Sequence, residues 1–246
     1  MAGRLEGKVA IITGAARGQG AAEARAFVAE GAKVVITDVL PEVDDVAREL
    51  GDAAIAFRHD VSDEAQWQAV AKAAIDTFGK IDVLVNNAGI FKPGTMMETT
   101  RDQFVSHTTV NQLGVFLGMK SVTEAMIANG GGSIVNIGSG AGQRGYPGIF
   151  AYLASKWAVT GMTKAAAREL AGHKIRVNSV HPGLIATPMI AGPEGGVDFM
   201  QETAKTVPLG RIGTTDDVVA VVLHLASDAS SYSTGGEFTM DGGTGL

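Results

Sequence analysis

The sequence contains no cysteine. Disulfide bonds, a thiolate nucleophile and a cysteine-ligated zinc ion are therefore excluded. The chain has five histidines, and they form no HExxH or similar pair that would suit a metal ion. We therefore expect neither a structural nor a catalytic metal. The histidines are His59, His107, His173, His181 and His224.

Charge is also scarce, since 19% of the residues are charged, the formal net charge is −6, and like charges form no blocks. Without a basic stripe to follow a phosphodiester backbone, nucleic acid is not an expected partner. Long apolar runs are missing too. The N-terminal run "VAIIT" follows Arg4, Glu6 and Lys8, and it is too short and wrongly flanked for a signal peptide or a membrane span. We expect a cytoplasmic protein without membrane association.

The sequence is rich in apolar residues, 46% of 246, and in glycine, with 33. This composition favours one α/β domain over residues 1–246 with many tight turns between strands and helices. Seven short apolar runs alternate with longer segments, such as 20–31 and 63–79, in which apolar residues recur at three- and four-residue spacing. The alternation predicts a doubly wound parallel sheet with helices on both faces. The predicted strands are 8–14, 33–38, 53–60, 81–89, 132–139, 175–183 and 236–243.

The segment 187–213 interrupts this alternation with proline, glycine and scattered large apolar residues. It follows the sixth predicted strand, at the edge of the sheet where open parallel sheets bind ligands. We expect a flexible lid over a binding site, because exposed Met and Phe side chains are costly with nothing to cover. An ordinary surface loop is the alternative.

A glycine-rich turn, "TGAARGQG" at 13–20, joins the first predicted strand to the first predicted helix. Gly14, Gly18 and Gly20 would let the backbone approach a pyrophosphate, whose charge is met by unpaired N–H groups at the helix start. A purely structural turn is the alternative. The position between strand and helix favours dinucleotide binding.

Asp38 ends the second predicted strand. A carboxylate at this place can accept hydrogen bonds from the ribose hydroxyls of adenosine, and it would repel a 2′-phosphate. The next residues are Val39 and Leu40 rather than Arg or Lys, so we expect NAD rather than NADP. Arg17 in the glycine turn is a possible phosphate contact that weakens this preference, and a strand-end cap is the alternative role for Asp38.

Two further strand ends face the same crevice in this architecture. Asp60 and Val61 follow the third predicted strand and could bracket the adenine edge, while "NNAG" at 86–89 turns sharply after the fourth. Asn86 and Asn87 could instead satisfy local backbone groups, as Asn often does at turns.

Tyr152 and Lys156 lie four residues apart in "YLASK", on one face of a predicted helix. Two unit charges about 4 Å apart in an effective dielectric of about 20 attract by about 4 kcal/mol, or roughly three pKa units. The pKa of the phenol would then fall from about 10 towards about 7, although burial opposes the shift. Such a phenol suits general acid–base catalysis of alcohol oxidation or ketone reduction, and Ser139 could hold the substrate oxygen. The pair alone occurs by chance in many helices, so its combination with the glycine turn and Asp38 carries the inference.

These features resemble the short-chain dehydrogenases/reductases across essentially the whole chain. The motifs that carry the resemblance are "TGAARGQG", Asp38, "NNAG", Asn111, Ser139, "YLASK", "HPG" (181–183) and "MDGG" (240–243). The resemblance implies a single Rossmann-type domain with seven parallel strands and a catalytic tetrad. In that tetrad Asn111 holds a water in a proton relay and Ser139 orients the substrate oxygen. Tyr152 is the acid/base, and Lys156 binds the nicotinamide ribose and lowers the pKa of the tyrosine.

By the same resemblance, Thr187 contacts the nicotinamide carboxamide and Ile185 lies beside the ring. Three positions depart from the family pattern: Gln19 replaces an aliphatic residue, Gly138 a second serine and Leu113 a small polar residue. None of them removes a catalytic group. The expected cofactor-binding residues are Gly14, Arg17, Gly18, Gln19, Gly20, Asp38, Asp60, Val61, Asn87, Ala88, Gly89, Tyr152, Lys156, Pro182, Gly183, Ile185 and Thr187.

Within the family, stretches such as "GVFLGMK", "ASKWAV" and "SDASSYSTGGEF" look most like bacterial 3α/20β-hydroxysteroid dehydrogenases. We therefore expect NAD-dependent interconversion of a bulky hydrophobic secondary alcohol and its ketone. A 3-oxoacyl-[acyl-carrier-protein] reductase is the alternative, against which Asp38 and the acidic composition argue. A non-catalytic dinucleotide-sensing protein is a remote alternative. The expected substrate pocket is Ser139, Gln143, Tyr146, Met189, Ile190, Phe199 and Met200, several of which could instead be core or interface residues.

The predicted helical stretches 99–128 and 150–171 carry apolar and small residues on more than one face, which exceeds what one sheet face can cover. The resemblance implies that these helices pair across a dimer and that the C-terminal strand joins dimers into a homotetramer. Ordinary core packing is the alternative.

Overall fold

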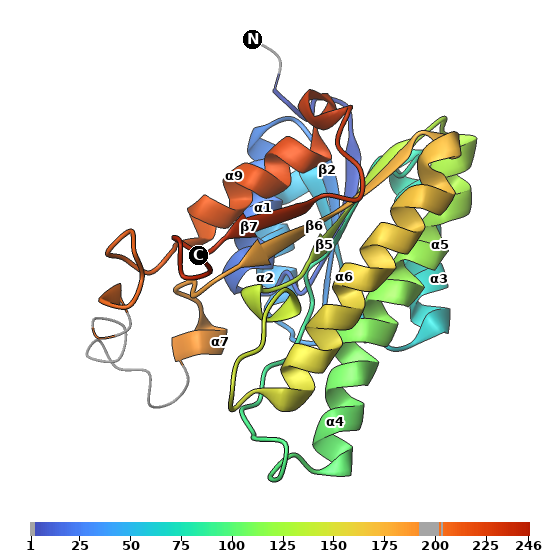
Figure 1. Ribbon diagram of the computed structural model, residues 1–246. Coiled ribbons are helices and arrows are strands. Elements are labelled where there is room, and N and C mark those ends of the chain that lie inside the picture. The colour runs from blue at the N-terminus through green and yellow to red at the C-terminus, as the bar shows by residue number, and fades with distance from the viewer. Residues whose placement is uncertain (1–2, 192–201, 203) are drawn as a thin grey trace.

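One sheet of seven parallel strands organises the computed structural model, which describes residues 3–191, 202 and 204–246 (Figure 1). The strand order is β3-β2-β1-β4-β5-β6-β7, and every neighbouring pair is parallel. The order reverses between β1 and β4, so a crevice is expected between the carboxyl ends of these two strands. The strands are β1 (Val9–Thr13), β2 (Lys33–Asp38), β3 (Ala54–Arg58), β4 (Val83–Asn86), β5 (Gly132–Ile137), β6 (Ile175–Pro182) and β7 (Glu237–Met240).

Helices cover both faces of the sheet (Figure 1). One buried cluster joins the sheet to α1, α2 and α9, and a second joins it to α3, α5 and α6. The predicted fold class, a doubly wound Rossmann-type sheet with helices on both faces, is confirmed. The helices are α1 (Gly18–Ala29), α2 (Val43–Leu50), α3 (Glu64–Phe78), α4 (Arg101–His107), α5 (Gly114–Ala128), α6 (Phe150–Leu170), α7 (Pro188–Ala191) and α9 (Thr215–Ala226), with a π-helical segment, Thr108–Leu113, between α4 and α5.

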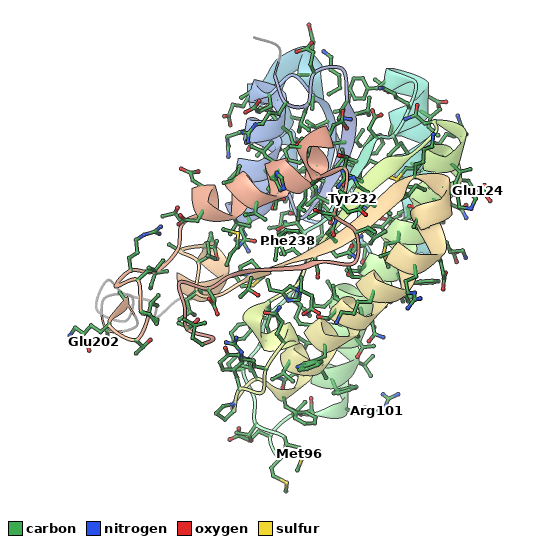
Figure 2. The ribbon with its side chains drawn as sticks, turned by 45° about the horizontal axis from the view of Figure 1, so that its top comes forward. Met96, Arg101, Glu124, Glu202, Tyr232 and Phe238 are labelled. Carbon is green, nitrogen blue, oxygen red and sulfur yellow. The ribbon has the colours of Figure 1, made fainter. Side chains whose placement is uncertain are left out.

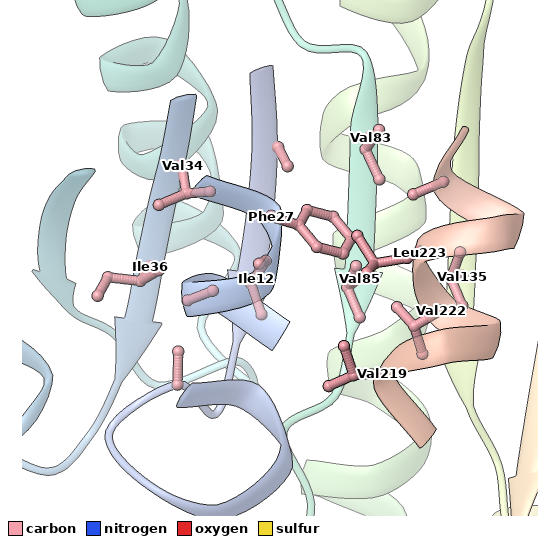
Figure 3. Close-up of a cluster of buried hydrophobic side chains, with 14 of the residues drawn as sticks. Ile12, Phe27, Val34, Ile36, Val83, Val85, Val135, Val219, Val222 and Leu223 are labelled. Carbon is pink, nitrogen blue, oxygen red and sulfur yellow. The ribbon is translucent and has the colours of Figure 1, made fainter. Parts of the chain in front are cut away.

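Strands β1 to β6 contribute apolar side chains to both clusters, whereas the edge strand β7 contributes only to the first. In β2, Val34 and Ile36 point to the face of α1 and α9, while Val35 points to the face of α3 and α5. Phe27 of α1 is fully buried and lies between the sheet and Leu223 of α9 (Figure 3). This two-sided burial explains why the strand runs lack the polar alternation of a half-exposed sheet.

Side-chain caps fix the starts of α3 and α9, among other helices. The Asp63 carboxylate accepts hydrogen bonds from the first turn of α3, and Gly79, with φ +86°, ends that helix in the left-handed conformation. Thr214 and Asp217 form a capping box at the start of α9. Hydrogen bonds from Arg211 and Thr214 hold the pKa of Asp217 well below its usual range.

The insertion predicted at 187–213 begins and ends at one place. Ala186 N donates to Gly213 O at 2.9 Å, and Gly213 N donates to Leu184 O at 3.0 Å, so its two ends are joined directly beyond β6. Residues 192–201 and 203 of the insertion lie outside the described residues. The lid therefore stays a prediction.

Hydropathy of the helices bears on membrane association. Over residues 3–191, 202 and 204–246, no helix is both long enough and apolar enough to cross a membrane.

Helix α1 buries an acidic side chain, Glu23. The residue is fully buried, and neither carboxylate oxygen has a hydrogen-bond partner among the described residues. Burial raises the pKa of Glu23 to about 8, so the group is mostly protonated at neutral pH. A buried neutral acid without a partner is a local cost that the surrounding core offsets.

Replacing this carboxyl should stabilise the protein. The folded state binds the Glu23 proton more tightly than the unfolded chain, whose pKa is near 4.5. The contribution of Glu23 to the free energy of unfolding is therefore most favourable below pH 4.5, and it falls as the pH rises towards 8. The loss amounts to about 3 kcal/mol at pH 7. We expect Glu23→Leu to raise the free energy of unfolding at pH 7 by about 1–3 kcal/mol and to flatten its pH dependence.

Urea denaturation at pH 5, 6.5 and 8 measures this effect. The control is Glu124→Leu, because Glu124 is an exposed carboxylate that projects from α5 (Figure 2). A Glu23→Leu protein less stable than the parent at pH 8 would contradict the assignment of Glu23 as an unpaired buried acid.

Candidate active site

The glycine turn between β1 and α1 is a tight cradle. Gly14 has φ +68°, and a Cβ there would lie 2.8 Å from Ala88 Cα; a Cβ on Gly20 would lie 2.4 Å from Gly14 O. Both positions therefore require glycine. No side chain caps the start of α1, and its first turn carries no acidic residue. Its N–H groups are thus left for an anion, which fits the pyrophosphate of a dinucleotide.

The "NNAG" turn after β4 is fastened to this cradle. Asn87 Nδ2 donates to Thr13 O at 2.9 Å and to Gly14 O at 3.1 Å, and Thr13 Oγ1 accepts from the main-chain N–H groups of Asn87 and Ala88. Asn86 is turned into the core, where it donates to Asn136 Oδ1 at 2.9 Å. Both asparagines therefore satisfy polar groups of the protein, the alternative role considered for them, and Asn87 does so in the wall of the cradle.

Asp38 ends β2 directly beside the glycine turn. Its carboxylate accepts from Ala16 N and from Leu40 N, each at 3.0 Å. The strand-end cap considered from the sequence is therefore present, and each oxygen keeps a lone pair for a further donor. Arg17 is exposed at the start of α1. A cation that the sequence analysis missed, Arg58 at the end of β3, pairs with Asp38 in register and donates to the main chain next to it.

The loop after β3 carries the two residues predicted at the adenine edge. The exposed carboxylate of Asp60 accepts from the N–H and hydroxyl of Ser62. Val61 is buried, and its carbonyl accepts from Trp67 Nε1 at 2.8 Å. Asp60 is thus the more accessible of the two.

Ser139, Tyr152 and Lys156 come together where β5 ends and α6 begins. Ser139 Oγ accepts from Ala141 N at 3.1 Å, and its side chain is hydrogen-bonded to Tyr152. Lys156 is buried one turn further along α6; its Nζ donates to Ile137 O at 2.8 Å and lies 5.8 Å from the centre of the Tyr152 ring. The predicted cluster is therefore assembled.

Two glycine positions connect this cluster to the cradle. A Cβ on Gly89 would lie 3.3 Å from Asn111 Oδ1 and 3.7 Å from Lys156 Nζ, and a Cβ on Gly18 would lie 3.8 Å from the Thr187 side chain. The glycine turn, the end of β4, the catalytic cluster and the segment after β6 thus border one region at the carboxyl edge of the sheet. That is where a nicotinamide dinucleotide binds in this type of fold.

Asn111 lies fully buried in the π-helical segment. Its Oδ1 accepts from Ile90 N at 2.8 Å, and its Nδ2 donates to Ile90 O and to Ser155 Oγ, each at 3.0 Å. Both amide protons are therefore used within the protein. A water-holding role is left to the main-chain carbonyl and to the second lone pair of Oδ1.

Comparison with known proteins identifies the family. A family model described as "Enoyl-(Acyl carrier protein) reductase" matches residues 14–245. Over 245 residues the chain is 48% identical to "3-alpha-(or 20-beta)-hydroxysteroid dehydrogenase" of Mycobacterium tuberculosis, with 99% of this chain and 92% of the relative covered. The chain belongs to the short-chain dehydrogenase/reductase family. This dehydrogenase is accordingly an oxidoreductase that acts on CH–OH groups.

Two further relatives show how widely substrates differ around this dehydrogenase. The "Trans-4-hydroxycyclohexanecarboxylate dehydrogenase" of Sinomonas cyclohexanicum is 44% identical, with 98% of this chain and 93% of the relative covered. The "NADP-dependent (R)-specific alcohol dehydrogenase" of Lentilactobacillus kefiri is 42% identical, with 99% and 98% covered. Family membership implies a dinucleotide of the NAD(P) type, and the residues of the cradle fit one.

The environment of Tyr152 differs from the expectation in one respect. Burial raises the pKa of Tyr152, and the hydrogen bond with Ser139 is the effect that lowers it. The expected fall towards about 7 is therefore wrong for these residues, because the Lys156 ammonium is bound to Ile137 O and faces the phenol ring. The ring is partly accessible, which limits the effect of burial. Burial also lowers the pKa of Lys156, to about 8.

The predicted substrate residues are spread more widely. The Gln143 amide donates to Glu237 Oε2 and accepts from Thr239, each at 3.0 Å, so it is turned towards β7 and already paired. Tyr146 is partly exposed, and its hydroxyl lies 3.8 Å from the position of a Cβ on Gly140, next to Ser139. Met189 is exposed and Ile190 partly buried, both in α7. Phe199 and Met200 lie outside the described residues.

The remaining predicted cofactor residues lie just beyond β6. Ile185 is buried, Thr187 Oγ1 donates to Ile185 O at 3.4 Å, and Gly183 N donates to Met240 O at 2.9 Å. Pro182 is the last residue of β6. At the other side of the crevice, Gln19 is partly exposed in the first turn of α1.

Three residues that the sequence analysis did not place in the site surround it. Phe91 and His107 pack edge-on against the Tyr152 ring, at centroid distances of 5.1 Å and 6.3 Å. His181 Nδ1 is hydrogen-bonded to Ser139 O at 2.9 Å. Its imidazole also explains Gly138, since a Cβ there would come within 2.7 Å of the ring. Only His181 had a signal in the sequence, the "HPG" motif.

Proposed function

We propose that this dehydrogenase interconverts a bulky hydrophobic secondary alcohol and its ketone, with NAD(H) as the cofactor. The observation that carries the proposal is the cluster of Ser139, Tyr152 and Lys156 beside a glycine cradle. A bound nicotinamide would accept or supply the hydride. The chain itself must then bind the substrate oxygen and exchange its proton.

Tyr152 is the proton-exchanging group in this proposal. Ser139 donates to the substrate oxygen. In ketone reduction the phenol of Tyr152 gives its proton to the ketone oxygen and becomes a phenolate, and in alcohol oxidation the phenolate takes the hydroxyl proton and becomes a phenol. Because burial raises its pKa, the phenol is protonated at neutral pH and ready to act as an acid. One donor of Lys156 is used by Ile137 O, so two remain for the ribose hydroxyls, and its positive charge favours the phenolate.

A hydrophobic ring alcohol is the substrate class that we infer. The relatives with hydroxysteroid and hydroxycyclohexane names support it, as does the apolar character of Met189 and Ile190 beside the crevice. A substrate panel of androsterone, cyclohexanol, 2-octanol and the corresponding ketones, followed by nicotinamide absorbance, tests the class. A preference for the acyclic 2-octanol would contradict it.

The alternatives predict other results. A 3-oxoacyl-[acyl-carrier-protein] reductase, the activity named for a relative that is 43% identical to this chain, would reduce an acetoacetyl thioester in preference to every member of the panel and would prefer NADPH. A dinucleotide-sensing protein would bind cofactor without turning over any of these compounds.

Replacing Tyr152 separates chemistry from binding. In Tyr152→Phe we expect kcat to fall at least about a hundredfold, because the hydroxyl that is proposed to exchange the proton is removed. The cofactor dissociation constant, measured by quenching of protein fluorescence, should stay within about twofold, since the phenol adds little to ground-state binding. Tyr232→Phe is the control, because Tyr232 is fully exposed on the surface (Figure 2). Unchanged turnover in Tyr152→Phe would refute the assignment.

Asp38 should decide between the two dinucleotides. Its carboxylate would repel a 2′-phosphate, so the parent should have the higher kcat/KM with NAD. In Asp38→Asn, which removes the charge and leaves Arg58 nearby, the preference for NAD over NADP should fall at least about tenfold. Asp44→Asn, an exposed carboxylate in the first turn of α2, is the control. A parent enzyme that prefers NADP would overturn the proposal.

We also infer a homotetramer, in which the outer faces of α4 to α6 pair two chains and the C-terminal strand β7 joins the two dimers. Size-exclusion chromatography with light scattering should give four times the 25.3 kDa of one chain. Trp157→Asp should dissociate the assembly, because it places a charge in an apolar contact, while Ile75→Asp on α3 should not. A monomeric parent would contradict the inference. The large apolar side chains exposed between the start of α4 and the end of α6 are Phe104, Val105, Leu113, Phe116, Ile127, Tyr146, Phe150 and Trp157.

A further inference from the structure

Three side chains at four-residue spacing, Gln103, His107 and Asn111, hold the loop 90–94 beside Tyr152. We call these three residues the positioning row. Asn111 grips the start of the loop, with its amide bonded to both the N–H and the carbonyl of Ile90. Residues four apart on a helix face the same direction, so all three side chains of the row can contact the same loop.

His107 holds the middle of the loop. Its Nε2 accepts from Lys92 N at 3.1 Å, and its Nδ1 lies 2.8 Å from Gln103 O. A main-chain N–H is always a donor, so Nε2 carries a lone pair and the ring proton is on Nδ1. The ring is fully buried. The Gln103 amide completes the grip by donating to Lys92 O at 3.3 Å and to Pro93 O at 2.9 Å.

The far end of the loop is joined to the segment that leads into α6. Gly94 N donates to Gly148 O at 2.7 Å, and Phe150 N donates to Gly94 O at 3.0 Å. Tyr152 stands in the first turn of that helix. The loop is therefore held at both ends and in the middle.

This fixed loop presents Phe91 to the catalytic tyrosine. The Phe91 ring meets the Tyr152 ring at 5.1 Å with an interplanar angle of 88°, and the His107 ring meets it at 6.3 Å and 79°. Edge-on pairs at these distances are attractive and directional. From the α6 side, Ser155 links Tyr152 O to Asn111 Nδ2, so the row contacts the tyrosine from two directions.

We propose that Gln103, His107 and Asn111 are positioning residues that orient the Tyr152 phenol, by holding the loop that carries Phe91 against it. The inference rests on the proposed function only for its catalytic consequence, since the orientation of the phenol is a property of the protein itself. The loss of this packing leaves the phenol free to rotate with its first turn of helix. A catalytic group displaced by about 1 Å can lose about a hundredfold in rate.

Two variants of similar size separate the hydrogen bond to the loop from mere filling of space. The Oε1 atom of His107→Gln can accept from Lys92 N in place of Nε2, whereas His107→Leu cannot. We expect kcat of His107→Leu to fall by about tenfold or more with little change in KM and in the cofactor dissociation constant. His107→Gln should keep most of the parent activity. Asp102→Asn, an exposed neighbour on α4, is the control.

Near-ultraviolet circular dichroism reports the orientation without any turnover. The contribution of Tyr152 is the difference between each protein and the same protein carrying Tyr152→Phe. It should be lost in His107→Leu and retained in His107→Gln. A Tyr152 signal that persists in His107→Leu, or an equal loss in both variants, overturns the proposal.

This readout keeps the two proposals apart. A parent protein that turns over no substrate of the panel refutes the proposed function, while the dichroism still decides the role of the row. If His107→Leu does not fold, Gln103→Met removes the two bonds to Lys92 O and Pro93 O from a partly exposed position. A reduced Tyr152 signal in Gln103→Met supports the row, and an unchanged one overturns it.

Discussion

The junction between the ends of β1 and β4 is the constraint on which the rest of the site depends. Four hydrogen bonds cross it. The main-chain N–H groups of Asn87 and Ala88 donate to Thr13 Oγ1, and Asn87 Nδ2 donates to Thr13 O and Gly14 O. They bring the two strand ends so close that side chains at Gly14 and Gly20 are excluded. The strand order of the sheet reverses at this junction, so the cradle, the "NNAG" turn and the cluster of Ser139, Tyr152 and Lys156 all lie at the same edge of the sheet.

The reactivity of Tyr152 results from opposing effects that reach it from separate parts of the chain. Burial favours the neutral phenol and Ser139 favours the phenolate, while the ammonium of Lys156 lies 5.8 Å from the centre of the phenol ring. Lys156 is itself held by the last carbonyl of β5, so the charge is fixed in place rather than free to follow the hydroxyl. This environment favours the protonated phenol of Tyr152, which is the form that acts as an acid. The phenolate, which acts as a base, depends on stabilisation by the groups around the hydroxyl.

The sequence predicted well whatever depends on local pattern. The seven strands, the glycine turn and the cluster around Tyr152 follow from periodicity and from fixed spacing along the chain. Strand ends were predicted too long, as in 81–89, because the residues after Asn86 leave the sheet to build the turn. The fold class needed nothing beyond these patterns.

What escaped prediction depends on pairs that only the tertiary structure creates. The amide of Gln143 is paired with β7, far along the chain, and Arg58 lies beside Asp38 through the register of β2 and β3. The burial of Glu23 runs against the preference of acidic side chains for the surface. The role of His107 depends on a loop with no periodicity to reveal it.

The closed base of the segment after β6 has a consequence for how this protein can diversify. Because Ala186 and Gly213 are bonded directly, the chain between them starts and finishes at a single point, and its length does not alter the spacing of the strands below. Lengthening such an excursion costs little, since the entropy of closing a loop grows only with the logarithm of its length. Segments of different length and composition can thus replace one another here, in evolution or by protein engineering, while the strands and the residues at their carboxyl ends keep their positions.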